Sequence, residues 1–373
     1  MQSSVHKKRW LRRIIILVLI PVFLITAGAV ARVIYRGALK SQKSIKSPGI
    51  DEVAYISIGD IEQWIYIRGQ DVNNPVLLII HGGPGYPISP SLHLFQYDLE
   101  DKFTVVQWDQ RLSGKTFFKN DFDTAREKAS FAQSCNDAWE VVQFLQNHLD
   151  QERIIVMGHS WGSSLGLWLA AEHPEALEAY IGVGQAVNLY DNERIGYENA
   201  LKAAQLAENQ EDIDMLMSLE PYPVRPYKPG PYYRAVGSLR QIQQKYDFYQ
   251  PASSWLETFN AWTSPYYSLH ELSYFTRDDI TYLHEAENRY LMEDYDAYSL
   301  GLTYQIPFFI IQGEKDIITS TVLAEEFFEE ITAPSKRIFI IPNTAHVPMT
   351  EDSESFTSIL KDEILPLLTQ VEL

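Results

Sequence analysis

Residues 154–164, IIVMGHSWGSS, place a serine inside a turn framed by glycines. Gly158 and Gly162 stand two positions before and two positions after Ser160, between the apolar run RIIVMG and the helix-like stretch SSLGLWLAAEHPE. A serine on a tight strand-to-helix turn has a strained backbone and an exposed hydroxyl, and bulky residues at the flanking positions would clash. The pattern therefore predicts that Ser160 is the nucleophile of an acyl-transfer reaction.

A histidine must take the proton of this serine, and either the adjacent His159 or one far along the chain could do so. On the predicted turn, neighbouring side chains point in different directions, so His159 is predicted to be a packing residue. His346 lies in FIIPNTAHVP, directly after the last predicted strand, where a loop can return to the carboxyl edge of the sheet. We therefore predict that His346 is the general base.

The base in turn needs a carboxylate that fixes its tautomer and stabilises the imidazolium formed during the reaction. On a scaffold with this serine turn, the acid follows the serine and precedes the histidine along the chain. FFIIQGEKDIIT supplies Asp316 after an apolar run, with Glu314 as a weaker competitor. Ser160, Asp316 and His346 are the predicted catalytic set.

The same chemistry requires two backbone amides that bind the oxyanion of the tetrahedral intermediate. One amide comes from the residue after the nucleophile, Trp161, and the other from a loop after the third strand. LLIIHGGPG is that loop, and its glycines allow the backbone to approach a substrate closely. Gly83 is the predicted second donor, with Gly82 as the alternative.

Several elements must position these residues, and the apolar runs of the sequence predict them. Helix-length segments separate several short β-branched runs, which is typical of a parallel α/β sheet covered by helices on both faces. We predict about eight strands, in the segments EVAYISI, QWIYIRG, VLLIIHG, FTVVQWD, RIIVMGH, AYIGVGQ, PFFIIQG and RIFIIPN.

One long interval interrupts this alternation. Residues 188–303 contain helical patterns and a proline-rich break but no clear buried strand, and they hold 15 of the 22 tyrosines. An insertion of this size between two strands indicates a mainly helical cap. The predicted core therefore comprises residues 50–187 and 304–373.

The N-terminus has a different composition from the rest. KKRWLRR, with five cations, precedes the eighteen uncharged residues 14–31, close to the ~20 that span a bilayer as a helix. We predict a basic cytoplasmic tail and transmembrane anchor over 1–35, a linker over 36–49, and an extracytoplasmic catalytic domain at the cell membrane. The alternative is a secreted protein whose signal peptide is cleaved near AGAVA.

Charge restricts the partners of the catalytic domain. After residue 46 the chain has 21 basic and 49 acidic residues, a net charge of −28. Such a domain is repelled by nucleic acid, so no nucleic-acid partner is expected. The lone cysteine, Cys135, excludes an internal disulfide and gives no evidence about the redox compartment.

Five motifs in order carry a family resemblance that extends over roughly residues 50–365. They are HGGPG at 81–85, WDQRLSG at 108–114, GHSWGSS at 158–164, GEKD at 313–316 and AHVP at 345–348. Together they resemble the α/β-hydrolase fold, and within it the proline iminopeptidase family of serine aminopeptidases. The family usually has a glycine where this chain has Leu112, and within the same motif we interpret Asp109 and Arg111 as residues that brace loops near the site.

The resemblance implies an activity and one further site residue. It implies release of N-terminal residues, often proline, from short peptides through an acyl-enzyme, with neither metal nor organic cofactor. HEAENRYL is similar to the cap segment that holds the substrate's free amine in the family, which implies this role for Glu287. A solvated helix glutamate is the alternative for Glu287, and an esterase, lactonase or amidase acting on small acyl substrates is the alternative activity.

Overall fold

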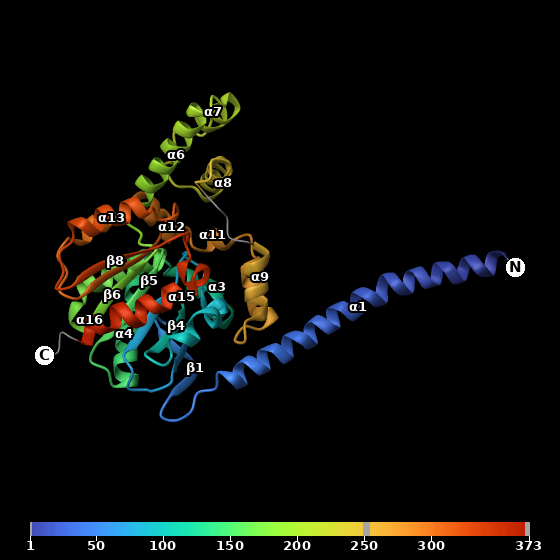
Figure 1. The fold of residues 1–373 in the computed structure, drawn as a ribbon, viewed down its shortest axis with the longest axis horizontal. Coiled ribbons are helices and arrows are strands. Elements are labelled where there is room, and N and C mark those ends of the chain that lie inside the picture. The colour runs from blue at the N-terminus through green and yellow to red at the C-terminus, as the bar shows by residue number, and fades with distance from the viewer. Residues whose placement is uncertain (1, 249–253, 370–373) are drawn as a thin grey trace.

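The computed structural model describes residues 2–248 and 254–369. An eight-stranded sheet lies at the centre of the folded domain (Figure 1). The strand order is β1-β2-β4-β3-β5-β6-β7-β8. All eight predicted strands are present, and their bounds are β1 Ile50–Ile58, β2 Ile61–Gly69, β3 Val76–Ile80, β4 Thr104–Asp109, β5 Ile154–His159, β6 Leu177–Val183, β7 Phe308–Gly313 and β8 Lys336–Ile341.

One strand, β2, runs opposite to the other seven, which differs from the predicted parallel sheet. β1 pairs with β2 in an antiparallel ladder, and β2 pairs with β4 in the same way, whereas the pairs from β4 to β8 are parallel. The cause is the short connection between β1 and β2, Gly59 and Asp60, because a parallel neighbour needs a crossover of a dozen or more residues.

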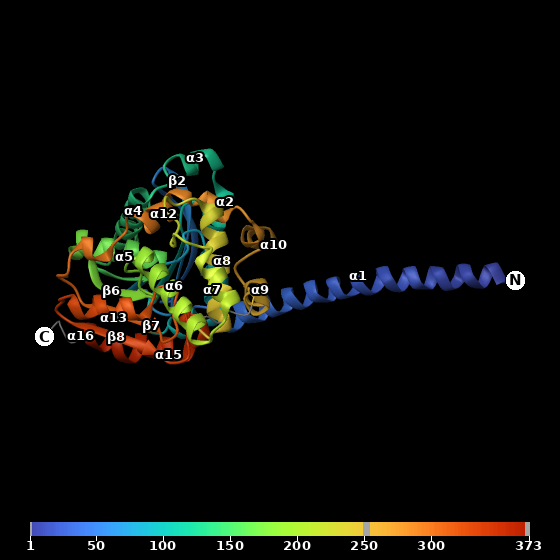
Figure 2. The ribbon, with the colours of Figure 1, turned by 90° about the horizontal axis from the view of Figure 1, so that it is seen from above.

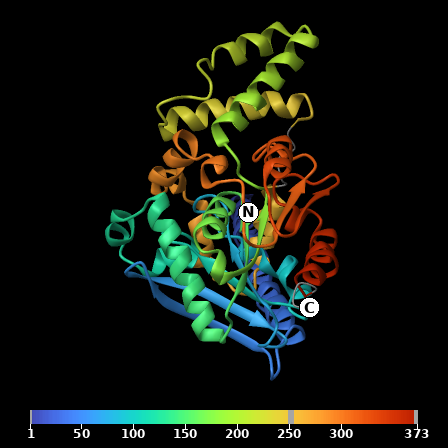
Figure 3. The same cartoon turned by 90° about the vertical axis from the view of Figure 1, so that its left-hand side faces the viewer.

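Helices cover both faces of the sheet, as the alternating pattern predicts. Side chains of Leu78, Val106 and Val156 pack toward one face with Val141 of α4 and Leu165 of α5. Leu77, Val105 and Ile155 pack toward the other face with the C-terminal helices, and Figure 3 shows α4 and those red helices on opposite sides of the sheet. The helices of the core are α2 Gly114–Lys119, α3 Phe122–Glu127, α4 Phe131–Leu149, α5 Trp161–Glu172, α13 Thr321–Glu330, α14 Pro348–Glu351, α15 Ser353–Ser358, the π-helix η6 Ile359–Ile364 and α16 Leu365–Thr369.

The interval between β6 and β7 forms a helical cap, as predicted. In Figure 1, α6 and α7 project away from the sheet at the top, and α9 lies on the side of the molecule nearest the N-terminal helix α1, Gln2–Gln42. The elements of the cap are α6 Leu189–Leu206, α7 Gln210–Met217, α8 Pro229–Lys245, α9 Ser254–Thr263, α10 Leu269–Leu272, η4 Ser273–Thr276, α11 Ile280–Leu283, α12 Glu285–Glu293 and η5 Ala297–Leu300. Shorter 3₁₀ segments outside the cap are η1 Ser89–Leu94, η2 Gln96–Asp98 and η3 Pro174–Ala176.

The N-terminal segment is one long helix, α1, with bounds Gln2–Gln42 (Figures 1 and 2). Its part Leu17–Gln42 contains an 18-residue stretch with a mean hydropathy of 2.4 and is long and apolar enough to cross a membrane. The helix also includes residues 36–42, so the first half of the predicted linker is helical. Its last turns contact the folded domain, which stabilises helical structure where composition alone suggests a flexible connection.

Candidate active site

Ser160 lies on a sharp turn between β5 and α5. Its φ of 53° and ψ of −119° are unusual for a residue with a side chain, and its amide donates a hydrogen bond to Val183 O over 2.9 Å. A Cβ on Gly158 would come within 2.3 Å of Gly162 O, and a Cβ on Gly162 within 2.1 Å of Ile80 O. Both flanking glycines are therefore required by the close approach of backbone, as the motif predicts.

Asp316 and His346 meet at the carboxyl edge of the sheet. Asp316 Oδ2 lies 2.9 Å from His346 Nδ1, and the carboxylate also accepts hydrogen bonds from the amide and hydroxyl of Thr319 at 3.0 and 2.9 Å. Burial alone would raise the pKa of Asp316, but the neighbouring His346 and these hydrogen bonds outweigh burial and hold the pKa below its usual value. Asp316 is thus positioned as an ionised partner of the imidazole.

The competing carboxylate, Glu314, points elsewhere. Its side chain is exposed and its Oε2 accepts a hydrogen bond from the Asn343 amide at 2.9 Å. The structure therefore brings Asp316, and not Glu314, to His346.

His159 packs beside His346 instead of reaching the serine hydroxyl. Its Nε2 lies 2.8 Å from the carbonyl oxygen of His346, and the two imidazole rings are 4.9 Å apart. Burial, with a smaller contribution from His346, lowers the pKa of His159 to about 4, so the ring is neutral at pH 7 and its Nε2–H donates to that carbonyl. Ser160 Oγ makes no hydrogen bond within the described residues, and such contacts often tighten only when substrate binds.

The glycine loop after β3 approaches the serine turn closely. A Cβ on Gly82 would lie 3.1 Å from Ser160 Cβ, so this loop is in contact with the serine side chain. Gly83 has a φ of +118°, and a Cβ there would lie 2.5 Å from the Gly85 amide. Trp161 is the first residue of α5, where amides have no acceptor inside the helix. Trp161 and Gly82 therefore lie beside Ser160, and Gly83 is the next residue of the loop.

A glutamine that the sequence analysis passed over connects the two sides of this site. Gln110 Nε2 donates to His81 O at 2.8 Å, and Gln110 Oε1 accepts from Trp161 Nε1 at 3.0 Å. The Gln110 amide donates to His81 Nε2 at 3.1 Å, which fits a neutral imidazole because burial lowers the pKa of His81 to about 3. The sequence could have indicated Gln110 as a site residue only through its place inside WDQRLSG, between Asp109 and Arg111.

Asp109 and Arg111 hold neighbouring loops, as we interpreted them. Asp109 is fully buried and accepts hydrogen bonds from Ser89 Oγ, the Lys115 amide and the hydroxyl of Tyr267 in the cap. Burial raises its pKa to about 6 despite these donors. Arg111 Nε pairs with Asp137 Oδ2 at 3.0 Å. The cap and the loop after β4 are therefore joined through a buried carboxylate.

Leu112, at the position where the family has glycine, has a left-handed backbone conformation. Leu112 has a φ of +57°, a conformation that favours glycine. The Tyr274 hydroxyl lies 3.0 Å from Leu112 O and 2.8 Å from Gly85 O, so a cap residue contacts both this loop and the glycine loop.

The cap contributes a buried pair of titratable side chains next to the glycine loop. Glu287 is 2% exposed, and its Oε1 lies 3.7 Å from His284 Nδ1. Among the described residues, neither Glu287 Oε2 nor either ring nitrogen of His284 has a hydrogen-bond partner. A Cβ on Gly85 would lie 2.5 Å from His284 Cδ2, which places the pair against the loop. Sequence reasoning missed His284, whose only signal was its place three residues before Glu287.

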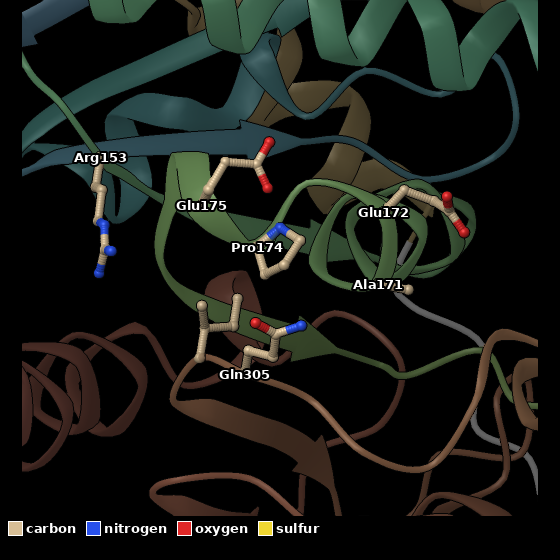
Figure 4. Close-up of a pocket in the computed structure, with 7 residues that line it drawn as sticks. Arg153, Ala171, Glu172, Pro174, Glu175 and Gln305 are labelled. Atoms are coloured by element: carbon tan, nitrogen blue, oxygen red, sulfur yellow. The ribbon is translucent and has the colours of Figure 1, made fainter.

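A surface cavity lies away from Ser160, and the described part of the chain offers no cluster of metal ligands. A surface cavity of about 450 Å³ opens at the amino ends of the central strands, the edge opposite Ser160 (Figure 4). Residues before β5 and β7, at the end of α5 and between α5 and β6 line it, including Arg153, Glu172, Glu175 and Gln305. Among the described residues, no group of three or more histidine, cysteine, aspartate or glutamate side chains could hold a metal ion.

Comparison with known proteins agrees with this geometry. The family model described as the α/β hydrolase fold matches residues 75–353. A probable aminopeptidase of Bacillus subtilis (strain 168) is 27% identical over 306 residues, which cover 82% of this chain and 93% of the relative. The structure of a proline iminopeptidase-related protein from Thermus thermophilus superposes with a TM-score of 0.56 at 20% identity, over 86% of this chain and 99% of that one. A membrane phospholipase A matches 99% of both chains, with a TM-score of 0.55 at 16% identity. The chain therefore belongs to the α/β hydrolase fold family.

Proposed function

We propose that this hydrolase is a serine aminopeptidase that releases N-terminal residues from short peptides. Ser160 Oγ attacks the carbonyl carbon of the first residue while His346 takes the hydroxyl proton, and Asp316 stabilises the resulting imidazolium. The amides of Trp161 and Gly83, or Gly82, bind the oxyanion. His346 then protonates the departing amine of the shortened peptide, and water hydrolyses the acyl-enzyme by the reverse proton transfers.

One observation carries the peptide assignment: Glu287 Oε2 is a buried carboxylate oxygen without a partner among the described residues. A buried carboxylate oxygen without a hydrogen-bond partner is costly inside a protein unless a ligand supplies a donor. The ammonium of a free N-terminus is such a ligand, and His284 places the site against the glycine loop that contacts Ser160. The name of the Bacillus relative, a probable aminopeptidase, supports the same activity.

A second candidate function follows from His284. Its Nδ1 lies 3.7 Å from Glu287 Oε1, so the carboxylate already has an imidazole beside it within the cap. If this imidazole serves as the partner of Glu287, no substrate ammonium is needed, and the alternative is an esterase, lactonase or amidase that uses the same catalytic residues on an uncharged acyl group.

We further propose that the enzyme keeps α1 as a membrane anchor, with the basic tail in the cytoplasm and residues 50–373 outside it. The apolar run of eighteen residues supports a span, and the five cations of residues 7–13 favour a cytoplasmic tail. Residues 32–46 also carry five cations, so the orientation needs a direct test. Protease added to intact cells should remove the domain and leave a short membrane-bound stub, whereas mature protein beginning near Arg32 in the medium would show cleavage.

The test of amine recognition compares Glu287→Gln with the wild type on prolyl and alanyl arylamides, their N-acetylated forms and a simple acyl ester. Glutamine keeps the shape of the side chain and removes its charge. We expect kcat/KM on the free aminoacyl substrates to fall by the equivalent of about 1.5–3 kcal/mol, roughly 10- to 150-fold. Hydrolysis of the ester should change little.

Glu285→Gln is the matched control, because Glu285 lies on the same helix but forms a surface ion pair with Arg289. It should leave every substrate unaffected. Efficient cleavage of the acetylated amides by the wild type, or equal losses on all substrates in Glu287→Gln, would reject amine recognition and favour the second candidate.

A further inference from the structure

Three cations lie along one side of the last turns of α1, and a fourth, Lys43, directly follows the helix. Arg32, Arg36, Lys40 and Lys43 follow one another at intervals of four, four and three residues, the spacing that places side chains on a single helix face. Within a flexible linker such residues would be solvated. Here this face, which we call the basic stripe, points to the folded domain.

The basic stripe binds backbone carbonyls of the cap. Arg32 Nε donates to Trp262 O at 2.6 Å, and one of its Nη atoms donates to Tyr267 O at 2.8 Å. Arg36 donates to Pro265 O at 2.8 Å. Arg32 is only 7% exposed, although it belongs to a helix that otherwise projects from the molecule. A buried guanidinium with two carbonyl acceptors is a specific contact, unlike a solvent-exposed surface ion pair.

The rest of the basic stripe continues the contact toward the core. Lys40 Nζ lies 5.3 Å from the ring centroid of Tyr266, and Lys43 Nζ lies 3.7 Å from Asp98 Oδ1. Arg68, a residue of β2, donates to Lys43 O. The end of α1 is therefore attached to the cap and to the core.

The opposite side of the same turns is apolar and uncovered. Val30, Val33 and Ile34 are each more than half exposed. A helix whose cations bind protein and whose apolar residues face outward is suited to the boundary between a folded domain and lipid.

The length of the uncharged run sets the height of this contact relative to a bilayer. The run ends at Ala31, and eighteen helical residues extend about 27 Å, close to the ~30 Å of the hydrocarbon core. Arg32 is the next residue, so the cap carbonyls that it binds lie at the membrane boundary. Phe259 and Leu269, on either side of this cap segment, are 48% and 59% exposed.

We infer that the basic stripe of α1 docks onto cap residues 259–269 and thereby holds this segment, through Phe259 and Leu269, against the bilayer surface. The inference rests on the proposed anchoring by α1. The partner is the lipid interface of the same membrane, and neutral lipids suffice because the contact is apolar. The acidic body of the domain, which anionic lipid repels, is separated from the bilayer by the cations of α1.

The experiment measures the depth of spin labels on the full-length protein in phosphatidylcholine vesicles. Phe259→Cys and Leu269→Cys are labelled with a nitroxide, and Leu206→Cys at the end of α6 and Val322→Cys on α13 are the controls, since both residues are exposed. Cys135, the sole native cysteine, is buried, and burial raises the pKa of its thiol, so the unsubstituted chain should not be labelled. Accessibility to oxygen, which enriches in lipid, is compared with accessibility to a water-soluble nickel chelate.

We expect the labels at 259 and 269 to be more accessible to oxygen than to the nickel chelate, which is the lipid pattern. The labels at 206 and 322 should show the reverse, aqueous pattern. Replacing Arg32 and Arg36 together by alanine should shift the first two labels to the aqueous pattern, while Arg194→Ala with Arg337→Ala, both surface arginines, should not. The inference would be overturned if the labels at 259 and 269 showed the aqueous pattern in the otherwise unchanged protein. It would also be overturned if their accessibility did not change when Arg32 and Arg36 were replaced. Flotation with the vesicles is measured in parallel, so that a failure of the anchor itself is recognised separately.

Discussion

The Gln110 side chain joins the glycine loop to the residue after Ser160, and removing it should damage both stability and turnover. Gln110→Ala leaves two groups without partners in the interior, Trp161 Nε1 and His81 O. Each unsatisfied buried group costs about 1–3 kcal/mol, so we expect the free energy of unfolding to fall by about 2–6 kcal/mol.

The same change should lower kcat. Without Gln110, the two amides proposed to bind the oxyanion belong to segments that are no longer tied together at this point. Misplacement of such groups by about 1 Å costs up to roughly 100-fold in rate, and we expect a loss of about 10- to 100-fold in kcat with a smaller change in KM.

Gln107→Ala is the matched control, because Gln107 is a buried glutamine of the neighbouring strand β4 whose Nε2 donates to Gln96 Oε1 at 3.0 Å. It should lose about 1–3 kcal/mol of stability and keep its kcat. Both variants are assayed by urea unfolding and by hydrolysis of an aminoacyl arylamide well below the unfolding midpoint. If Gln110→Ala kept the wild-type kcat, or if Gln107→Ala lost as much, the connecting role of Gln110 would be refuted.

Three other predictions concern the histidines and their acid. His346→Ala should reduce kcat by at least about a thousandfold while His159→Ala costs far less, and equal losses in two folded variants would contradict the assignment of the base. Asp316→Asn should lower kcat by roughly 10³- to 10⁴-fold with little change in KM, because an amide favours the wrong imidazole tautomer; steady-state kinetics at pH 7 would show it. Because the pKa of His159 is about 4 in the folded state and near 6.5 when unfolded, the unfolded state gains a proton first, and this histidine should lower stability by about 3 kcal/mol between pH 7 and pH 4, in addition to the contribution of buried His81. His159→Gln, which keeps a donor for His346 O, should flatten that slope in urea titrations, and an unchanged slope would count against the burial argument.

Local patterns were sufficient to predict the strands and the serine turn. β-branched runs mark all eight strands, and the glycines around Ser160 are required by backbone contacts within the turn itself. The reversed direction of β2 was missed because apolar periodicity carries no information on direction, although the two-residue connection at Gly59 does.

Residues whose roles depend on distant contacts could not be found in this way. Gln110 meets Trp161 across 51 positions, and Arg32 meets Tyr267 across 235. Similar contacts of Arg36 with Pro265 O and of Lys40 with the Tyr266 ring hold the last turns of α1, which continues to Gln42 where composition suggested a linker. The unpaired atoms of His284 become evident only once the cap lies over the glycine loop.

The central claim, that Ser160 is the nucleophile of a serine hydrolase, is tested most directly by covalent trapping. The full-length protein is incubated with a fluorophosphonate, digested, and the modified peptide is identified by mass spectrometry. We predict a single adduct per chain, on Ser160, that abolishes hydrolysis, is absent in Ser160→Ala and forms at least about a hundredfold more slowly in His346→Ala. An adduct on another residue, or hydrolysis retained by purified Ser160→Ala, would contradict the mechanism.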